Sequence, residues 1–413
     1  MAEECDVIIF GASGYTGRFV ITEMIRICRN YPDIRWAIAG RSKPKLEAAL
    51  LVAKNNGEDV SGIQIIIADA EDEESIKAMC RRCKLVMNCS GPFMWYGEAV
   101  VKAAIECKIH YIDVCSEFTF LETIKKYDAA ACDSGVLVIN ACGLGCLTAD
   151  LGVLFLQQQF QGTLNSVEAY LTTQPDVIRG LPKNVIRNST WEALVYDMMA
   201  KPFWGSSKVQ GDLNLEPELK TRTFVHKRFN RWCIPFPGSE EIVVERTQNY
   251  FKHSRPIQFK RYRSLPSLFT SLVSIIGGYL ILLLLKFFGL CSFFIKYPRI
   301  ASLGLVTYGD PDEKIMERLR FDYLMVGVGW KGDVKGPPCE EMIVEVYPIG
   351  KRNAPYEGTA IAVIYSALTI LTEREKIPKC GVLTPGAAFK NTSIIDKLNN
   401  DNLKFKIKAT NKI

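Results

Sequence analysis

Short apolar runs alternate with helical patterns over the first 150 residues of the chain. Helical periodicity is found around 16–29, 44–55, 73–81, 97–107 and 118–132. The apolar runs around these segments predict six strands. They are Val7–Phe10, Trp36–Ser42 (the strand and its C-terminal tip), Ile63–Ala68, Leu85–Cys89, His110–Val114 and Val136–Asn140. Strands that alternate with helices of this length predict an α/β fold with a doubly wound parallel sheet.

The alternation stops after residue 150. A helix is expected near 188–199, and strands without regular crossover helices are expected at Val167–Thr173, Thr221–Cys233, Glu241–Arg246, Arg320–Gly327 and Met342–Tyr347. This pattern predicts a second α+β domain with a mostly antiparallel sheet. The tail reads as a helix at Tyr356–Glu373, a strand at Cys380–Thr384, a helix near 393–400 and a strand at 403–409. We therefore expect domains at 1–150 and 151–352, with 353–413 packing back toward the first.

One apolar segment interrupts the second domain. Leu265–Leu285 contains no charged residue, and after Lys286 the chain is apolar again to Ile295. A helix of 21 residues is about 31 Å long, close to the thickness of a bilayer core of about 30 Å. Strands of one domain lie on both sides of the segment, which argues against a simple span. We expect 265–295 to insert into a membrane as a hairpin broken at Gly277–Gly278 or as a monotopic element, the alternative being a buried core helix.

Basic residues precede this segment. Ten Lys/Arg and three Glu lie between Arg222 and Arg263, and the stretch 252–263 ends in Lys-Arg-Tyr-Arg. Cations beside an insertion point favour an anionic lipid surface. The sequence thus predicts a lipid monolayer or membrane as partner, through 265–295 and 252–263, rather than a nucleic acid. A solvated basic face remains an alternative, and homo-oligomerisation is left open.

Glycines follow the first predicted strand at intervals of three. The stretch Gly11-Ala12-Ser13-Gly14-Tyr15-Thr16-Gly17 leads from the strand into a helical pattern. Such a turn places backbone N–H groups and a helix N-terminus against a phosphate. Taken alone the motif is weak, since glycine turns are common. Its position between strand and helix favours a dinucleotide in a Rossmann-type domain.

The tip of the second strand selects the dinucleotide. An NAD site usually has an acidic residue there for the ribose 2′-hydroxyl. This chain has Arg41 and Ser42 instead, with two lysines close behind. A guanidinium pairs well with a 2′-phosphate. The sequence therefore predicts NADP(H), the alternative being a solvated basic loop. Ends of other strands add candidate cofactor contacts at Asp69, Ser90, Gly91 and Pro92, each of which could equally be an ordinary loop residue.

The composition limits which redox and metal chemistry is expected. The chain has 413 residues, 48% of them apolar, a net charge of +6, 14 scattered cysteines and three histidines. No signal peptide precedes the first strand, so we expect a reduced, non-secreted protein. Cys80-Arg-Arg-Cys83 lacks a second Cys/His pair at zinc spacing, and no metal site is predicted.

The chain resembles the saccharopine dehydrogenase-like oxidoreductases of animals over nearly its whole length. The resemblance rests on Phe10–Gly17, Ala39–Ser42, Asn88–Phe93, Tyr96–Glu98, Tyr111–Asp113, Ala149–Gly152 and Leu383–Phe389. It implies a Rossmann domain with an inserted α/β domain, a nicotinamide cofactor, and location on lipid droplets and the cytosolic face of membranes such as the endoplasmic reticulum. More distant relatives include saccharopine-forming enzymes and bacterial enoyl reductases of glycolipid synthesis.

One loop departs from the family. Where relatives read Gly-Phe-Asp-Ser-Ile-Pro, this chain reads Gly143-Leu-Gly145-Cys146-Leu147-Thr148 and so loses a carboxylate and a hydroxyl. No catalytic residue is assigned, although Tyr96 and Cys146 could donate a proton, and saccharopine chemistry is not expected. Two functions follow: an NADP(H)-dependent oxidoreductase acting on a small or lipid-like substrate at a lipid surface, or a non-catalytic lipid-surface protein that retains NADP(H) as sensor or scaffold.

Overall fold

The computed structural model describes residues 5–174, 183–200, 216–252, 255–332, 334, 336–349 and 354–413. The chain divides into two compact units. The first contains the residues up to Leu147 and Tyr356–Leu398, and the second contains Thr148–Pro355 and Asn399–Ile413. The chain passes between them within the helices α7 (Leu144–Gln159), α14 (Ala354–Thr372) and α16 (Ile394–Asn400).

The first unit is built on a seven-stranded sheet in which every pair is parallel. Its order is β15-β6-β5-β4-β1-β2-β3, the Rossmann order with one strand added at the β6 edge. The strands are β1 (Cys5–Phe10), β2 (Trp36–Gly40), β3 (Gln64–Ile67), β4 (Cys83–Asn88), β5 (His110–Asp113), β6 (Leu137–Ile139) and β15 (Gly381–Leu383). The predicted doubly wound parallel sheet is confirmed.

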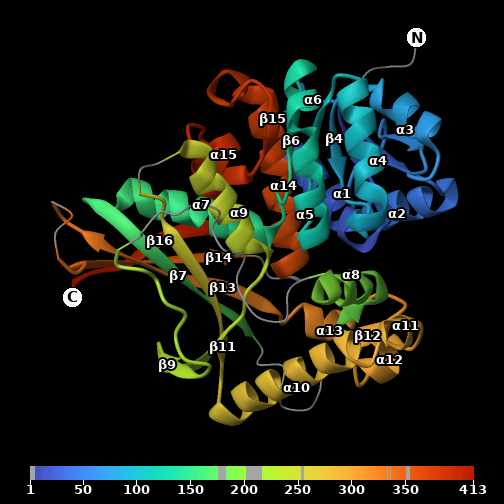
Figure 1. The fold of residues 1–413 in the computed structure, drawn as a ribbon. Helices are drawn as coiled ribbons and strands as arrows, with labels where there is room; N and C mark the ends of the chain where they lie inside the picture. Colours follow the sequence, from blue (N-terminus) through green and yellow to red (C-terminus); the bar gives the residue numbers. More distant parts are fainter. Residues whose placement is uncertain are drawn as a thin grey trace. The chain divides into compact units, whose positions relative to one another are not determined.

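Helices connect these strands and flank the sheet (Figure 1). They are α1 (Tyr15–Cys28), α2 (Lys43–Asn55), α3 (Glu73–Cys80), α4 (Phe93–Glu106), α5 (Phe118–Thr123), α6 (Asp128–Asp133) and α15 (Pro385–Phe389). Asp72 illustrates how the sequence starts such a helix, since its side chain accepts hydrogen bonds from the backbone of Glu74 and Ser75 at α3. Ile76 and Met79 of α3 and Val100 of α4 then pack into one buried cluster with Ile8 of β1.

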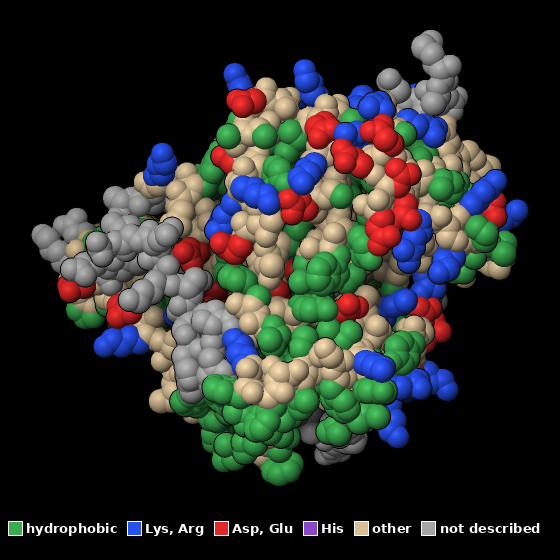
Figure 2. Space-filling view, turned by 45° about the vertical axis from the view of Figure 1, so that its right-hand side comes forward, with side chains coloured by type: hydrophobic (Ala, Val, Ile, Leu, Met, Phe, Trp, Pro, Cys, Tyr) green, Lys and Arg blue, Asp and Glu red, His purple; other side chains and the backbone are tan. Residues whose placement is uncertain are grey.

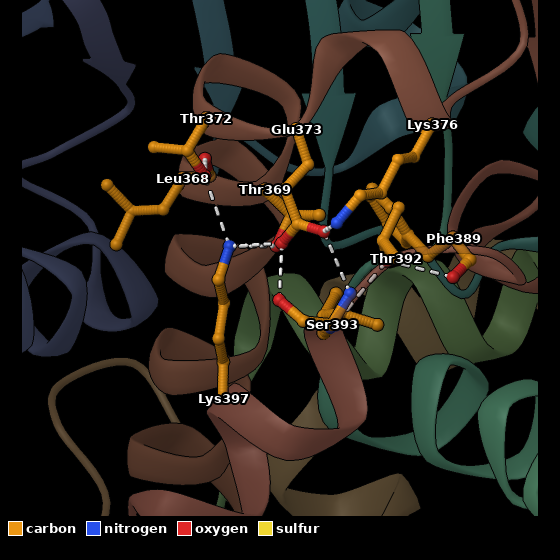
Figure 3. A network of polar contacts seen from close by, with 10 residues as sticks. Leu368, Thr369, Thr372, Glu373, Lys376, Phe389, Thr392, Ser393 and Lys397 are labelled. Carbon is orange, nitrogen blue, oxygen red and sulfur yellow. Dashed lines mark hydrogen bonds and ion pairs between the residues drawn. The ribbon is translucent and has the colours of Figure 1, made fainter.

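The carboxylate of Glu373, just after α14, holds the C-terminal part of this unit together (Figure 3). It pairs with Lys397 at 2.7 Å and Lys376 at 3.0 Å, and the backbone N–H of Ser393 donates to it at 3.0 Å. Burial alone would raise its pKa, but these hydrogen bonds outweigh burial and lower the pKa from 4.5 to about 2. A carboxylate stabilised in this way favours the folded state only while it is ionised.

We therefore expect Glu373→Gln to lower the stability of the protein by about 1–3 kcal/mol at pH 7. The contribution is complete above the unfolded pKa near 4.5 and disappears as the pH falls toward 2. Urea unfolding at pH 7 and at pH 3 should thus show a smaller difference between variant and wild type at pH 3. The exposed neighbour Glu375→Gln is the matched control, and an equal loss in both variants would contradict this role.

The second unit contains a seven-stranded sheet of order β16-β14-β13-β7-β11-β10-β9. All of its pairs are antiparallel except β7–β11. The strands are β7 (Thr163–Gln174), β9 (His226–Arg228), β10 (Arg231–Pro235), β11 (Gln258–Leu265), β13 (Arg320–Trp330), β14 (Glu340–Pro348) and β16 (Leu403–Lys412), and a separate pair joins β8 (Ile186–Arg187) to β12 (Val306–Thr307). The predicted mostly antiparallel second sheet is confirmed.

The helices of this unit are α8 (Asn188–Ala200), α9 (Ser239–Phe251), α10 (Leu268–Lys286), α11 (Cys291–Lys296), α12 (Pro298–Ala301) and α13 (Glu313–Met316). The strand predicted at Glu241–Arg246 is wrong, because these residues lie in α9. Val243, Val244 and Thr247 are among its buried positions, and an apolar run so short does not separate strand from helix.

Two other strand predictions change in detail. The single strand expected at Thr221–Cys233 is the hairpin of β9 and β10, turned at Phe229–Asn230, where both residues have positive φ. The tail also divides differently from the prediction, because β16 pairs with β14 of the second sheet while β15 pairs with β6 of the first.

The basic stretch 252–263 overlaps β11, which was not predicted. Arg261 is buried there and pairs with Glu240 at 3.1 Å, so its charge is already compensated. His253 and Ser254 lie outside the described residues. The apolar segment also differs from one expectation. Ser267 and Thr270 form a capping box that starts α10, and the helix continues through Gly277–Gly278 to Lys286, so the hairpin break is wrong.

Candidate dinucleotide-binding site

The glycine turn joins β1 to α1 at the carboxyl edge of the parallel sheet. Gly11 has φ +79°, and a Cβ atom there would lie 2.7 Å from the backbone nitrogen of Ser90. A Cβ on Gly17 would lie 2.4 Å from the carbonyl oxygen of Gly11. Both positions therefore require glycine for the turn to close. Gly14 is the N-cap of α1 and has no side chain to cap it, which suits a helix N-terminus that receives a phosphate.

The tip of β2 offers a cation for a second phosphate. Arg41 is exposed directly after Gly40, and it forms no ion pair with any residue that the structure describes. Lys43, two residues on, has Glu47 at 3.9 Å. A guanidinium without a carboxylate partner fits a phosphate ligand better than a structural ion pair. The residues at this tip thus fit a dinucleotide with a 2′-phosphate.

The loop after β4 approaches the glycine turn directly. The N–H of Ser90 donates to Asn88 Oδ1 at 2.9 Å, which fixes the loop beside Gly11. Gly91 and Pro92 follow, and Pro92 is the N-cap of α4. The N-terminus of α4 already has an anion, because the Glu117 carboxylate accepts hydrogen bonds from Phe93 and Met94, both at 2.8 Å. The helix terminus left for a cofactor phosphate is therefore that of α1 rather than α4.

Asp69 has a local structural role as well as its predicted place near the cofactor. It lies two residues beyond the end of β3, and its Oδ1 accepts a hydrogen bond from the N–H of Glu71 at 3.2 Å. Its own N–H donates to Ser75 Oγ at 3.0 Å. These bonds shape the turn into α3. A contact of Asp69 with the adenine end of the cofactor stays a prediction.

A buried carboxylate joins the ends of β5 and β6. Asp113 accepts hydrogen bonds from Asn140 Nδ2 at 2.6 Å, from the N–H of Ala141 at 2.8 Å and from the N–H of Cys115 at 3.0 Å. Burial raises the pKa of Asp113 to about 6, and these hydrogen bonds limit the rise. The carboxylate is fully enclosed, so its function is to hold the two loops in place rather than to exchange protons with a substrate.

Residues of α14 complete this region and were missed in the sequence. Tyr356 packs edge-on against Tyr15, with ring centroids 4.7 Å apart, and stacks on Phe19 at 5.8 Å. Thr359 Oγ1 accepts a hydrogen bond from the N–H of Leu144 at 3.2 Å. These contacts support the glycine turn and the start of α7 from a segment more than 200 residues away. No local sequence pattern predicts a contact between residues so far apart in the chain.

The segment that differs from the family pattern, residues 143–148, lies at the start of α7 and not in an open loop. Leu144 begins the helix, and Cys146, Leu147 and Thr148 are at most 2% exposed. The Cys146 thiol is thus enclosed, which does not suit a proton donor to substrate. Tyr96 lies half-buried on α4.

Comparison with known proteins defines the family. A family model described as the saccharopine dehydrogenase NADP binding domain matches residues 7–139. The chain is 34% identical over 428 residues to the saccharopine dehydrogenase-like oxidoreductase of Rattus norvegicus, and the match covers 98% of each chain. This chain belongs to the saccharopine dehydrogenase-like oxidoreductases. It is also 31% identical to the lipid droplet localized protein of Caenorhabditis elegans, again with 98% of each chain covered.

The family assignment agrees with the fold and the cofactor. Saccharopine dehydrogenase (L-Glu forming) from Saccharomyces cerevisiae has the same fold, with a TM-score of 0.56 at 15% identity, covering 98% of this chain and 100% of that one. The cofactor prediction of NADP(H) is confirmed by the matched domain. When bound, the cofactor supplies the hydride chemistry. We expect the α1 N-terminus to receive the pyrophosphate and Arg41 to bind the 2′-phosphate.

Proposed function

We propose that this protein is an NADP(H)-dependent oxidoreductase that works on a lipid surface and takes a lipid-soluble substrate from it. The observation that carries the lipid part is the outward face of α10. The name of the worm relative, which places that protein on lipid droplets, supports the same location. The cytosolic monolayer of a droplet or of the endoplasmic reticulum would give the dinucleotide domain access to NADP(H).

The outer face of α10 is apolar along its whole length. Among the described residues, α10 is the one helix long and apolar enough to cross a membrane, yet only 17% of its most apolar window is buried. Exposed side chains recur every three or four residues, which places them on one side of the helix. They include Phe269, Leu272, Val273, Ile276, Leu280 and Leu283, and Phe287 follows directly after the helix; Leu268 in the first turn is exposed as well. Figure 2 shows hydrophobic side chains gathered at the lower end of the view, where α10 lies in Figure 1.

The opposite face of α10 is packed on the protein, through hydroxyl side chains near its start and apolar side chains near its end. Thr270 and Ser271 are buried near its start. Leu285 near its end is fully buried in a cluster with Trp191 of α8 and Phe294 of α11. The Trp191 indole also donates to the carbonyl of Phe294 at 2.9 Å. A helix that is anchored to the protein on one face and still exposes a row of large apolar side chains on the other is arranged for an apolar phase outside the protein.

This packing favours insertion in the plane of a monolayer over a span. A helix of 19 residues is about 28 Å long, so the apolar stripe would lie along the surface over that distance. A span would have to pull Leu285 away from Trp191. Burial of one large apolar side chain stabilises by about 1.5–3 kcal/mol, so several together suffice for stable association.

The charge around α10 favours lipid over a protein partner. From Arg246 to Gly309 the chain contains nine Lys or Arg and no Asp or Glu. Lys296 and Arg299, which follow α10 on α11 and α12, are exposed. Exposed cations such as Lys296 and Arg299 beside an apolar face match the phosphate groups of a lipid surface.

The proposal is tested by floating the full-length chain with artificial droplets that have a triacylglycerol core and a monolayer of phosphatidylcholine with phosphatidylinositol. We expect most of the protein in the floating fraction, able to bind NADPH there and to oxidise it when neutral lipid extract is supplied. Protein that stays in the soluble fraction would contradict the lipid part. Floating protein that binds NADPH but never oxidises it would contradict the enzymatic part.

A non-catalytic NADP(H)-binding protein on the same surface is the second candidate. The change at residues 145 and 146 favours it, because the family pattern has a carboxylate and a hydroxyl where this chain has Gly145 and the buried Cys146. The same droplets distinguish the two functions, since only the enzyme turns NADPH over.

A further inference from the structure

Two cysteines that are 248 positions apart in sequence lie side by side in the first unit. Cys132 is on α6, and Cys380 immediately precedes β15. The Cys132 Sγ lies 3.5 Å from the position that a Cβ would take on Gly381, the residue after Cys380. The Cys380 thiol is also close enough to raise the pKa of Cys132. The Cys132 sulfur therefore lies against the backbone directly beside Cys380.

The backbone around the pair is held in register. Asp128 Oδ1 of α6 accepts a hydrogen bond from the N–H of Val382 at 2.8 Å. The N–H of Gly381 donates to the carbonyl of Val136 at 2.9 Å. The Arg374 guanidinium donates to the carbonyl of Pro378 at 2.9 Å and also to that of Lys379. These bonds fix the strand that carries Cys380 against the helix that carries Cys132.

The local charges distinguish the two thiols. The neighbouring Cys380 thiol, burial and the nearby Asp128 together raise the pKa of Cys132 to about 11. Cys132 therefore stays a thiol at neutral pH. The Arg374 side chain, which binds the carbonyls just before Cys380, interacts electrostatically with the Cys380 thiol.

Accessibility sets this pair apart from the other close cysteines. Cys132 is exposed and Cys380 is half-buried. The thiols of Cys80 and Cys83, which have a two-residue spacing in the sequence, are both buried, and burial raises the pKa of Cys80 to about 12. A reagent in solution can therefore reach Cys132 and Cys380 but not the Cys80–Cys83 pair.

We propose that Cys132 and Cys380 are an oxidation site that forms a reversible disulfide with a small-molecule disulfide, such as oxidised glutathione, as the oxidant. The Cys380 thiolate attacks one sulfur of the oxidant, forms a mixed disulfide and releases one thiol. Cys132 then loses its proton, attacks the Cys380 sulfur and releases the second thiol. In total the two cysteines lose two electrons and two protons, and the oxidant is reduced to two thiols.

The bond would tie the edge strand of the dinucleotide sheet to α6. Closure of so long a loop restricts the unfolded chain strongly. The segment it secures, Tyr356–Leu398, also carries Tyr356 and Thr359 beside the glycine turn and α7. Oxidation should thus make the dinucleotide unit more resistant to unfolding.

The test treats full-length protein with oxidised glutathione, blocks the remaining thiols and maps the peptides by mass spectrometry without reduction. We expect one peptide pair linked through Cys132 and Cys380, and a melting temperature raised by about 5 °C that dithiothreitol reverses. Cys132→Ser and Cys380→Ser should each abolish the shift, whereas Cys339→Ser, at an exposed cysteine of the second unit, should keep it.

Two results would overturn the proposal. One is a linked pair that never forms while Cys339 reacts readily with the same reagent. The other is stable glutathione on Cys132 or Cys380 with no bond between them, which would show that their sulfur atoms cannot reach disulfide geometry. Because both serine variants are conservative and Cys132 is exposed, equal melting temperatures of the reduced proteins would confirm that each variant folds.

Discussion

Replacement of both Ile276 and Leu280 by aspartate is expected to release the protein from lipid droplets almost completely. These side chains are 66% and 52% exposed at the middle of the outer face of α10. In solution they touch little of the protein, so the substitutions should leave stability nearly unchanged. On a droplet they would place two carboxylates in the acyl region, where a charge costs about 2–3 kcal/mol or more. We expect at least a 100-fold fall in partition.

Flotation of the purified variants measures this directly. The matched control is Leu51→Asp with Val52→Asp, because these α2 side chains are 54% and 51% exposed in the first unit. Deletion of 265–295 is a poorer test, since it also removes Leu285 and Phe294 from the cluster with Trp191. Lysine at 276 and 280 should retain more binding than aspartate, because a long cationic side chain reaches the phosphate layer. Equal flotation of the aspartate variant and wild type would refute insertion through this face.

The parallel sheet was largely readable from the sequence because most of its strands are nearly continuous buried runs. Val7, Ile8 and Ile9 have no exposed surface, and neighbouring strands repeat this pattern between amphipathic helices. The glycine turn was equally readable, because its constraints are local: Gly17 is required by atoms of Gly11 and Ala12, only a few residues away. Local requirements of this kind leave their pattern in a short stretch of sequence.

The second unit was harder to predict from the sequence because the positions of its residues depend on contacts with residues distant in the chain. Arg261 reads as a surface cation in a basic stretch, but it is buried because Glu240 and Tyr323 lie against it in the fold. The apolar residues of α9 look equally like a strand until the rest of the helix is considered. Tyr356 and Thr359 support the dinucleotide site from a separate part of the chain, so only the tertiary structure reveals them. The apolar length of α10 was evident, but which of its faces is outward depends on its packing against α8.

Replacement of Arg41 by alanine should remove the preference of the protein for NADPH. The guanidinium is exposed at the tip of β2 and has no ion-pair partner among the described residues, so the substitution costs the fold little. A bidentate pair with a 2′-phosphate is a strong charge-assisted interaction, and its loss should weaken NADPH binding by about 10- to 100-fold. NADH lacks that phosphate, and its affinity should stay within about twofold of wild type.

Fluorescence titration of both cofactors against the wild type and Arg41→Ala gives the ratio of dissociation constants that decides the assignment. Arg41→Lys should lie between the two, because an ammonium supplies charge without the planar fork. Lys54→Ala, an exposed cation in the last turn of α2, is the matched control and should leave the ratio unchanged. If the ratio of the NADPH and NADH dissociation constants were unaltered in Arg41→Ala, another cation would have to bind the 2′-phosphate. Equal weakening of both cofactors would instead mean that Arg41 supports the site as a whole and does not read the phosphate.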